Sequence, residues 1–465
     1  MIKLFGKYFS VRKILFIFGE GFLIFCAVTL ATYFLLGRSI GIPEILKADW
    51  MKILLVAVTA QVSLYLNDLY EIQPTGNIID LVTKLTQAVG ITSIILAVIY
   101  YLWPGTMIGR WIFFASLVIL ILFLVSWRVL YTYVIYKRFF SEKALIVGDG
   151  ELAGDICAEI KNKSELTYDV RYVVGLRMGN GPHKRLNGIP VRYGFDDLCD
   201  LAEAEQVSSI IVALDQKRGI MPYKELLNCK VRGISVIDGE TFYERITGKL
   251  LVDRISPSWL IFSDGFVKSP VTKLIKRAAG FFMSALMLII TSPLLLLVAL
   301  AIKLESEGPI LFSQERVGEN EKIFMIYKFR SMRANAEKDS GPVWAGENDP
   351  RITKVGKIIR KLRIDELPQL WNVLKGDMSF VGPRPERPFF VERLKKTIPY
   401  YVERFSVKPG ITGWAQVNYE YGASDEDSKE KLKYDLYYIK NMSLMLDVLV
   451  LFQTIKTVLL GRGSR

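Results

Sequence analysis

The sequence predicts a membrane protein that joins transmembrane helices to a Rossmann-like parallel α/β module and a mainly helical C-terminal part. Three observations predict this fold class. Hydrophobic residues make up 51% of the 465 residues and the mean hydropathy is positive, which is unusual for a soluble enzyme. Long apolar stretches fill the first 136 residues, and short β-like runs alternate with helical ones after residue 143.

A chain of this length is expected to form more than one domain, because domains usually hold about 100 to 200 residues. We predict a four-helix transmembrane domain over residues 1–138, a Rossmann-like module over 139–265 and a C-terminal domain over 266–465. The net charge of +13 suits anionic lipid headgroups, phosphorylated substrates or nucleic acid, and charge alone does not choose among them.

Four apolar stretches near the N-terminus each approach the about 20 residues that a helix needs to cross hydrocarbon. They cover residues 14–36, 50–66, 85–103 and 111–136. A cleaved signal peptide is not expected, because no small-residue cleavage site follows the first stretch. By the positive-inside rule, flanking basic residues place both ends of this domain in the cytoplasm. These residues are Lys3, Lys7, Arg12, Lys13, Lys137, Arg138 and Lys143.

The next segment, residues 139–265, alternates β-like and helical runs, which is typical of a parallel α/β layer. Its first run ends in a G-x-G-x-x-A turn, where backbone N–H groups can cradle a diphosphate. Gly148, Gly150 and Ala153 are therefore candidate nucleotide-binding residues. The second run lacks the acidic residue that would bind a ribose. A role in packing, regulation or dimer contact is the open alternative.

A fifth apolar stretch, residues 278–302, is long enough to span a membrane but carries Ser292 and Pro293 near its middle. Proline removes a helix hydrogen bond, so a break or sharp kink is expected there. Basic residues flank the stretch on both sides, which favours the cytoplasm for both ends. We therefore predict a re-entrant helix over residues 274–303, with a plain fifth crossing as the alternative.

Two segments have the pattern of amphipathic interfacial helices. Over residues 354–363, apolar side chains share one helical face and basic side chains occupy the rest. Packing of this segment on a protein core explains the pattern equally well. Residues 444–460 are apolar but contain Asp447, Gln453 and Lys456, so an interfacial helix is expected rather than a sixth span.

The residue types restrict the chemistry. The only histidine, His183, lies in a turn-like polar stretch, and the four cysteines show no spacing of a zinc site or a disulfide framework. A Ser-His or Cys-His nucleophile is therefore not expected.

Adjacent carboxylates, Asp365 and Glu366, follow the basic amphipathic segment. Helix capping is the ordinary explanation for Asp365, but helix N-termini also bind phosphate.

Phosphoryl transfer needs cations that neutralise the phosphate oxygens in the transition state. Arg384 lies between Pro383 and Pro385, which leave it little conformational entropy to lose. Arg316, Lys328 and Arg330 are further candidates for binding phosphate. A structural salt bridge is the alternative for Arg384, and solvation is the alternative for the others.

Ordered motifs also occur in the last part of the chain. They are Lys276-Arg277 before Ser292-Pro293, Glu307–Ile310, Gln314–Gly318, Tyr327–Met332, Asp365–Leu370, Val381–Glu386 and Lys408–Val417. In these motifs, residues 273–465 resemble the bacterial initiating sugar transferases, the monotopic polyprenyl-phosphate phosphoglycosyl transferases. The upstream spans and Rossmann-like module resemble the long members of the same family.

This resemblance implies transfer of a hexose-1-phosphate from a UDP-sugar to undecaprenyl phosphate. Asp365 would attack the phosphorus nearest the sugar and release UMP, and the lipid phosphate would then take the group from the aspartyl intermediate. Glu366 would hold Mg²⁺ and Arg384 would bind phosphate, with Lys408 and Gln416 as further binding candidates. The residue types alone leave direct attack with a carboxylate base open.

The resemblance further implies an enzyme of the bacterial inner membrane, with its catalytic domain on the cytoplasmic face, that initiates exopolysaccharide or related glycan synthesis. Its partners would be the UDP-sugar, undecaprenyl phosphate and membrane lipid, without nucleic acid, while a homodimer is an open question. Two positions depart from the family pattern. Gly280 stands where an Asp is usual, and residues 419–422 replace a usual Gly-Arg, so the sugar is not identified.

Two rival functions fit parts of the sequence. Membrane spans followed by a Rossmann-like module also describe a nucleotide-gated channel, but no Thr-Val-Gly-Tyr-Gly filter occurs among the spans. A membrane-bound NAD-dependent oxidoreductase would use the turn from Gly148 to Ala153, but the missing acidic residue argues against it.

Overall fold

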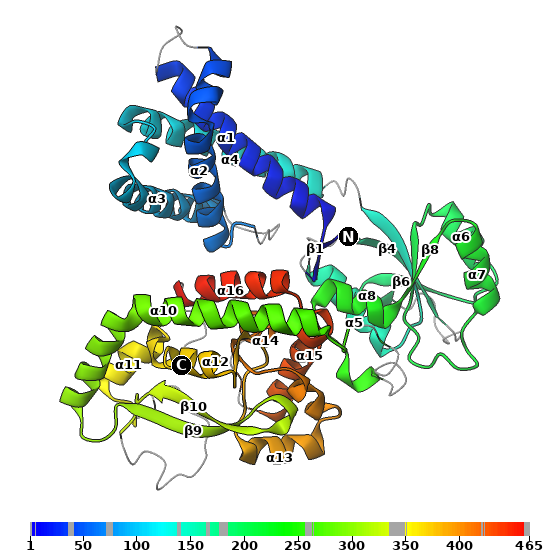
Figure 1. Cartoon of the computed structure of the whole chain (residues 1–465). Coiled ribbons are helices and arrows are strands. Elements are labelled where there is room, and N and C mark those ends of the chain that lie inside the picture. The colour runs from blue at the N-terminus through cyan, green and yellow to red at the C-terminus, as the bar shows by residue number, and fades with distance from the viewer. Residues whose placement is uncertain are drawn as a thin grey trace. The chain divides into compact units, whose positions relative to one another are not determined.

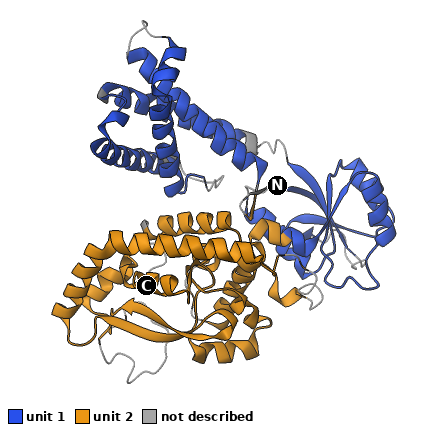
Figure 2. Cartoon of the chain, viewed as in Figure 1, with its two compact units in different colours: residues 1–2, 9–242 blue, residues 3–8, 243–465 orange. Residues whose placement is uncertain are grey.

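The structure is a computed structural model. It describes residues 2–4, 6–35, 41–70, 78–136, 141–163, 168–175, 185–255, 263, 265–333, 349, 351–419, 422 and 424–459. The chain forms two compact units (Figure 2). One unit comprises residues 1–2 and 9–242, and the other comprises residues 3–8 and 243–465.

Helices form at all four apolar N-terminal segments (Figure 1). They are α1 (Val11–Leu35), α2 (Ile42–Leu66), α3 (Ile78–Leu102) and α4 (Arg110–Tyr136), with η1 (Pro104–Thr106) before α4 and two short strands, β1 (Ile2–Leu4) and β2 (Lys7–Phe9), before α1. Within the described residues, α1, α3 and α4 are long and apolar enough to cross a membrane, and α2 is not among them. Apolar side chains of α2 nevertheless pack with those of its neighbours. Lys137 and Arg138 lie outside the described residues.

The predicted parallel α/β layer is confirmed as a six-stranded sheet with the order β5-β6-β4-β3-β7-β8. Its strand pairs are parallel except for β5 and β6. The order reverses at β3, as in doubly wound folds. The elements are β3 (Glu142–Val147), α5 (Glu151–Asn162), β4 (Tyr168–Gly175), β5 (Arg185–Leu186), β6 (Ile189–Tyr193), α6 (Leu198–Ala204), β7 (Ser209–Val212), α7 (Tyr223–Val231), β8 (Ser235–Asp238) and α8 (Gly239–Thr247).

One expectation about the cysteines is wrong. Cys199 of α6 and Cys229 of α7 form a disulfide within the apolar cluster beside the sheet. The two residues are 30 positions apart, and only the packing of their helices brings the Cα atoms to 5.2 Å. Sequence spacing therefore carried no signal for this pair.

The second unit is mainly helical, with an antiparallel pair β9–β10 and a parallel pair β11–β12. Trp414, Tyr437 and Phe405 lie in its largest apolar cluster. Its elements are η2 (Val252–Arg254), α10 (Pro270–Glu305), β9 (Leu311–Val317), η3 (Glu319–Glu321), β10 (Ile323–Phe329), α11 (Lys354–Lys361), η4 (Ile364–Glu366), α12 (Gln369–Lys375), β11 (Ser379–Val381), α13 (Pro388–Thr397), η5 (Tyr401–Ser406), β12 (Gly410–Thr412), α14 (Trp414–Asn418), α15 (Asp425–Asn441) and α16 (Leu444–Leu459).

We expected a break or a sharp kink at Pro293, and helix α10 continues through this residue without a break. Figure 1 shows that α10 nevertheless changes direction along its length. Proline leaves the carbonyl of Ile289 without its helical donor, and the Ser292 hydroxyl donates to that oxygen at 2.8 Å. A neighbouring hydroxyl therefore replaces the lost bond and keeps the helix intact.

The two predicted amphipathic segments form α11 and α16. In α11, Ile359 is buried against β10 and α10, whereas Ile358 is 61% exposed. The apolar side chains of α11 thus lie partly in the protein core and partly at the surface. In α16, Leu446 and Val450 are buried, while Val448 is 60% exposed. Each helix therefore presents apolar side chains outward as well as inward.

Candidate active site

Asp365 and Glu366 lie in η4, a single tight turn between two helices. The hydroxyl of Thr353 caps the start of α11. After α11, Arg363 adopts a φ of 58°, the left-handed conformation that ends helices and redirects the chain. Helix α12 then begins at Gln369 without a side-chain cap. Asp365 therefore caps neither helix, and the capping alternative is wrong.

Three cations converge on one oxygen of Glu366. The Lys328 ammonium and the Arg384 guanidinium each lie 2.9 Å from Glu366 Oε1, and Arg363 lies 3.8 Å from it. Asp365 and Glu366 are 9% and 8% exposed. Asp365 Oδ1 is buried and has no hydrogen-bond partner within the described ranges. The Glu366 carboxylate is thus neutralised by cations, and Asp365 keeps one buried oxygen without a hydrogen bond among the described residues.

The two carboxylates have opposite pKa displacements. Burial and the adjacent charge of Glu366 raise the pKa of Asp365 from 3.8 to about 6. Burial acts on Glu366 in the same direction, but Lys328, Arg384 and Arg363 together hold its pKa well below the usual range. Both groups are therefore ionised at neutral pH, and Asp365 is the more basic and more nucleophilic of the two.

Strand β10 carries Lys328, and α12 fixes this strand through Asn372. The Asn372 side chain accepts from the Tyr327 N–H at 3.1 Å and donates to the Met325 carbonyl at 2.7 Å. It is fully buried at 0% exposure. A carboxamide offers both a donor and an acceptor, so it bonds the strand edge as a neighbouring strand would. Asn372 thereby holds Lys328 close to the turn that carries Glu366.

Two other arginines hold the backbone around Arg384. Arg404 donates to the Arg384 carbonyl at 3.0 Å and to the Asp435 carboxylate at 2.8 Å. Arg404 and Asp435 are 5% and 2% exposed. Arg316 donates to the Pro385 carbonyl at 3.0 Å. Arg316, expected to bind phosphate, thus contacts the backbone of the turn that presents Arg384.

The other predicted binding residues also bond to backbone carbonyls. Arg330 donates to two carbonyl oxygens after the end of α10, at 2.6 and 2.8 Å. Lys408 donates to a carbonyl at the end of α12 at 2.6 Å. Gln416 donates to the Ile411 carbonyl at 3.4 Å. Of the six residues predicted to bind phosphate, the structure brings Lys328 and Arg384 into contact with Glu366.

Sequence reasoning missed three residues of this region. Arg363 lies two positions before Asp365 in the basic segment, so its proximity was a usable signal. Arg404 and Asn372 are buried, and the groups that they bind are about 20 or more positions away. No pattern in the sequence indicates contacts of that kind.

The carboxylate pair fits a magnesium ion that arrives with a substrate. Mg²⁺ prefers oxygen ligands and is usually held by one or two carboxylates together with substrate phosphates. Asp365 and Glu366 supply such oxygens, and the orphaned Asp365 Oδ1 is available to a ligand. No group of three or more acidic, histidine or cysteine side chains in the described part of the chain could hold a metal ion. Phosphate oxygens would therefore complete the coordination.

In the Rossmann-like module, the G-x-G-x-x-A turn joins β3 to α5 at the reversal of strand order. Asp215 accepts hydrogen bonds from the backbone N–H groups of Glu151 and Leu152, at 3.0 and 3.3 Å. A Cβ atom at Gly150 would lie 1.9 Å from Asp215 Oδ2, so a larger residue would displace this carboxylate. The chain's own carboxylate thus bonds the N–H groups that a diphosphate would use.

Gly148 and Ala153 have packing roles in the same turn. Gly148 has a φ of 120°, and a Cβ atom there would lie 2.3 Å from the Ala213 carbonyl oxygen. Ala153 is fully buried at 0% exposure. Close packing therefore accounts for the small size of both residues, and their binding of a nucleotide stays a prediction.

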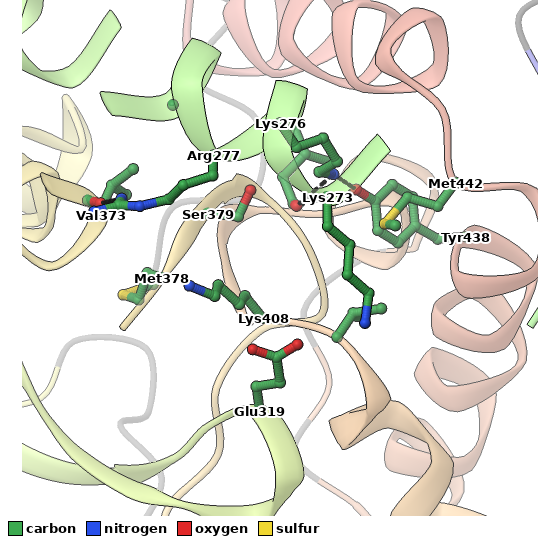
Figure 3. A pocket seen from close by; sticks show the side chains of 13 residues that line it. Lys273, Lys276, Arg277, Glu319, Val373, Met378, Ser379, Lys408, Tyr438 and Met442 are labelled. Carbon is green, nitrogen blue, oxygen red and sulfur yellow. Dashed lines mark hydrogen bonds between the residues drawn. The ribbon is translucent and has the colours of Figure 1, made fainter. Parts of the chain in front are cut away.

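A cavity of about 250 Å³ lies at the start of α10 (Figure 3). Neither Asp365 nor Glu366 lines it. Four basic side chains, one carboxylate and several apolar residues surround it: Lys273, Lys276, Arg277, Gly280, Glu319, Val373, Met378, Ser379, Val381, Val407, Lys408, Tyr438 and Met442. This cavity is therefore distinct from the carboxylate pair.

Two protein families match the chain. Residues 271–461 match the bacterial sugar transferase family. Residues 65–220 match a CoA-binding domain family. The first match contains the carboxylate pair and its cations, and the second contains the G-x-G-x-x-A turn.

Curated relatives match part of the chain. The chain is 47% identical over 240 residues to a UDP-N-acetylgalactosamine-undecaprenyl-phosphate N-acetylgalactosaminephosphotransferase of Aeromonas hydrophila, which covers 52% of this chain and 56% of that protein. It is 44% identical over 189 residues to a UDP-glucose:undecaprenyl-phosphate glucose-1-phosphate transferase of Escherichia coli (strain K12), covering 40% of each. The chain therefore spans about half the length, or less, of these two relatives.

A shorter relative is covered almost entirely. The chain is 43% identical over 198 residues to an exopolysaccharide production protein PSS of Rhizobium leguminosarum bv. phaseoli, which covers 41% of this chain and 98% of that protein.

Proposed function

The chain belongs to the bacterial sugar transferase family, and we propose that it transfers a hexose-1-phosphate from a UDP-sugar to undecaprenyl phosphate. One observation supports this most: a buried carboxylate pair in which Glu366 binds three cations and Asp365 keeps an unpaired oxygen. The names of the relatives support a UDP-hexose as donor, with N-acetylgalactosamine and glucose both represented.

The proposed reaction has two displacements. An oxygen of Asp365 bonds to the phosphorus nearest the sugar, the bond from that phosphorus to the bridging oxygen breaks, and the electron pair leaves with UMP. A phosphate oxygen of undecaprenyl phosphate then bonds to the same phosphorus. The bond to Asp365 breaks, which restores the carboxylate and releases the lipid diphosphate sugar.

The surrounding residues would serve this reaction through charge and position. Arg384, Lys328 and Arg363 lie where the negative charge of a diphosphate would need compensation. When a diphosphate enters, these cations can exchange part of their contact with Glu366 for phosphate oxygens. Glu366 would then hold Mg²⁺, which supplies further positive charge to the phosphate oxygens.

Helix α10 is proposed to enter one leaflet and return. Its start is bound to the unit, because Lys276 pairs with Asp447 at 2.6 Å and Arg277 donates to the Leu374 carbonyl at 2.6 Å. Its end is bound to the same unit, where Val298 and Ile302 pack in one apolar cluster with residues of β10 and α11. A helix anchored at both ends to one body favours re-entry over a plain crossing.

The middle of α10 supplies the lipid-facing surface. Phe282, Ile289 and Leu296 are each 71% exposed and are seven positions apart, so they share one helical face. Apolar side chains exposed to this degree are stable in hydrocarbon rather than in water. We place the unit on the cytoplasmic face of the bacterial inner membrane, where the basic flanks of α10 meet anionic headgroups.

The proposal is tested with the full-length protein reconstituted in lipid nanodiscs. Each of several UDP-sugars is supplied with undecaprenyl phosphate, and UMP release is measured. We expect release with one or a few UDP-hexoses, and none with Asp365→Asn. Robust UMP release by Asp365→Asn would refute the nucleophile assignment.

A second variant tests whether Glu366 is a ligand of Mg²⁺. We expect Glu366→Gln to lose most activity and to respond only weakly to added Mg²⁺. A Mg²⁺ response equal to that of the wild type would contradict a ligand role for Glu366.

A further inference from the structure

The cavity at the start of α10 has a surplus of positive charge. Lys276 is neutralised by Asp447 at 2.6 Å, but Arg277 and Lys408 donate to backbone carbonyls of α12 and Gly376. Carbonyl groups fix these cations in place without cancelling their formal charge. Lys273 adds a further cation, and Glu319 is the one carboxylate among the lining residues.

The cations that line the cavity carry more donors than their bonds to carbonyl groups use. An ammonium carries three N–H groups and a guanidinium five. Lys408 uses one of these groups in its bond to Gly376, and Arg277 uses two in its bonds to Val373 and Leu374. Capping of the α12 carbonyls therefore explains the placement of both residues but leaves donors for an anion. Figure 3 shows Lys273 and Glu319 directed toward the same space from α10 and η3.

The size and walls of the cavity restrict the anion. Its volume of about 250 Å³ is below the about 300 to 1,000 Å³ of sites that enclose drug-sized ligands, so it suits a headgroup better than a nucleotide sugar. Val373, Val407 and Met442 contribute apolar walls. A phosphate ester with an apolar continuation matches both the charge and the walls.

The position on α10 indicates the source of this phosphate. Leu274 and Phe282, in the second and fourth turns of the helix, are 69% and 71% exposed. In the proposed membrane position they contact acyl chains, which places Lys273 at headgroup level. Basic pockets between helices at the cytoplasmic side of a membrane are typical sites for anionic lipid headgroups.

We propose that this cavity binds the phosphate of an anionic phospholipid and so fixes the base of α10 at the membrane surface. The inference rests on the proposed membrane position of α10 but not on the sugar-transfer reaction. The bound phosphate is not the reacting one, because Asp365, Glu366 and Arg384 do not line the cavity.

The test measures lipid that stays on the full-length protein. The protein is released from nanodiscs of mixed phosphatidylglycerol and phosphatidylcholine, and bound lipid is identified by native mass spectrometry without any UDP-sugar. We expect preferential retention of phosphatidylglycerol. Lys273→Gln should weaken it about fivefold, which corresponds to the ~1 kcal/mol that one basic residue contributes near an anionic surface.

Three further variants sharpen the result. Glu319→Gln removes the carboxylate that repels an anion and should strengthen retention of phosphatidylglycerol. This effect is opposite to that expected of Lys273→Gln. Lys303→Gln makes the same charge change at the exposed far end of α10 and should have no effect. Asp365→Asn should retain lipid like the wild type, so failure of the catalytic proposal leaves this test intact.

Three outcomes would overturn the proposal. If Lys273→Gln and Lys303→Gln lose equal amounts of bound phosphatidylglycerol, the lipid is held by general charge attraction and not by a specific site. If Lys273→Gln and Glu319→Gln both retain as much phosphatidylglycerol as the wild type, the cavity is excluded as the binding site. Displacement of phosphatidylglycerol by inorganic phosphate would assign the cavity to a free anion rather than to a lipid.

Discussion

Replacing Asp365 with asparagine should stabilise the protein at neutral pH while removing its proposed nucleophile. Burial and the charge of Glu366 raise the Asp365 pKa from 3.8 to about 6, so folding disfavours the ionised form. The stability that this side chain contributes is therefore complete below about pH 4 and is lost as the pH rises through about 6. Asparagine stays neutral at every pH and avoids that loss.

The magnitude follows from the pKa. Since a tenfold change in ionisation is about 1.4 kcal/mol, the displacement from 3.8 to about 6 corresponds to about 3 kcal/mol at pH 7.5. The amide of the introduced asparagine is itself incompletely paired when buried, so we expect a net gain of about 1 to 3 kcal/mol. At pH 4 the part of the gain that comes from the pKa should fall to about 0.5 kcal/mol, because the native carboxyl group is then almost entirely neutral.

Thermal unfolding in nanodiscs, followed from pH 4 to 8, measures this difference. A gain of this size should raise the Tm of a unit of this size by several degrees. Asp253→Asn is the matched control, since its side chain is 54% exposed and its replacement should change stability by less than about 0.5 kcal/mol. If the Asp365→Asn protein is less stable than the wild type at pH 7.5, or if its gain is as large at pH 4 as at pH 7.5, the ionised Asp365 carboxylate does not destabilise the fold.

Three other predictions concern the site and the module. The rate of forming the covalent intermediate should fall about tenfold from pH 7 to pH 5, because Asp365 must lose its proton to react. Arg363→Gln should move the midpoint of this pH dependence to higher pH, since Arg363 lowers the pKa of Asp365. Arg404→Lys should lower kcat about tenfold to a hundredfold through misplacement of Arg384, with little change in the pH midpoint. Asp215→Ala should raise the affinity for a soluble dinucleotide, measured by calorimetry, because it frees the N–H groups at the start of α5.

Each of these predictions has a contrary outcome. A flat rate between pH 5 and 7, or a midpoint that Arg363→Gln does not move, would contradict the assigned pKa. Full kcat in Arg404→Lys would show that its bond to the Arg384 carbonyl has no positioning role. No dinucleotide binding by Asp215→Ala would leave the module with a packing role alone.

Periodicity and motifs predicted the elements that depend on local sequence. The four N-terminal helices, the alternating strands and the helix from residue 270 all lie where hydrophobic runs of fitting length indicated. Asp365 and Glu366 were likewise visible after an amphipathic segment and Arg384 between two prolines, while Lys328 was one of several further cationic candidates. Local patterns suffice for such features because each depends on neighbours in the chain.

Features set by tertiary packing were not visible in the sequence. The structure gives Arg330, Lys408 and Arg316 backbone carbonyl partners that no local pattern reveals, while their expected binding of phosphate stays a prediction. The disulfide between Cys199 and Cys229 depends on the packing of two helices. At Pro293 a break or a sharp kink was expected, and the hydrogen bond from the Ser292 hydroxyl to the Ile289 carbonyl lets the helix continue.

The most direct test of the account is the mass of the protein after exposure to a UDP-sugar without lipid acceptor. We predict a sugar-phosphate adduct on the peptide that contains Asp365, which disappears when undecaprenyl phosphate is added. Turnover without any adduct, or an adduct on a different residue, would contradict the central role given to Asp365.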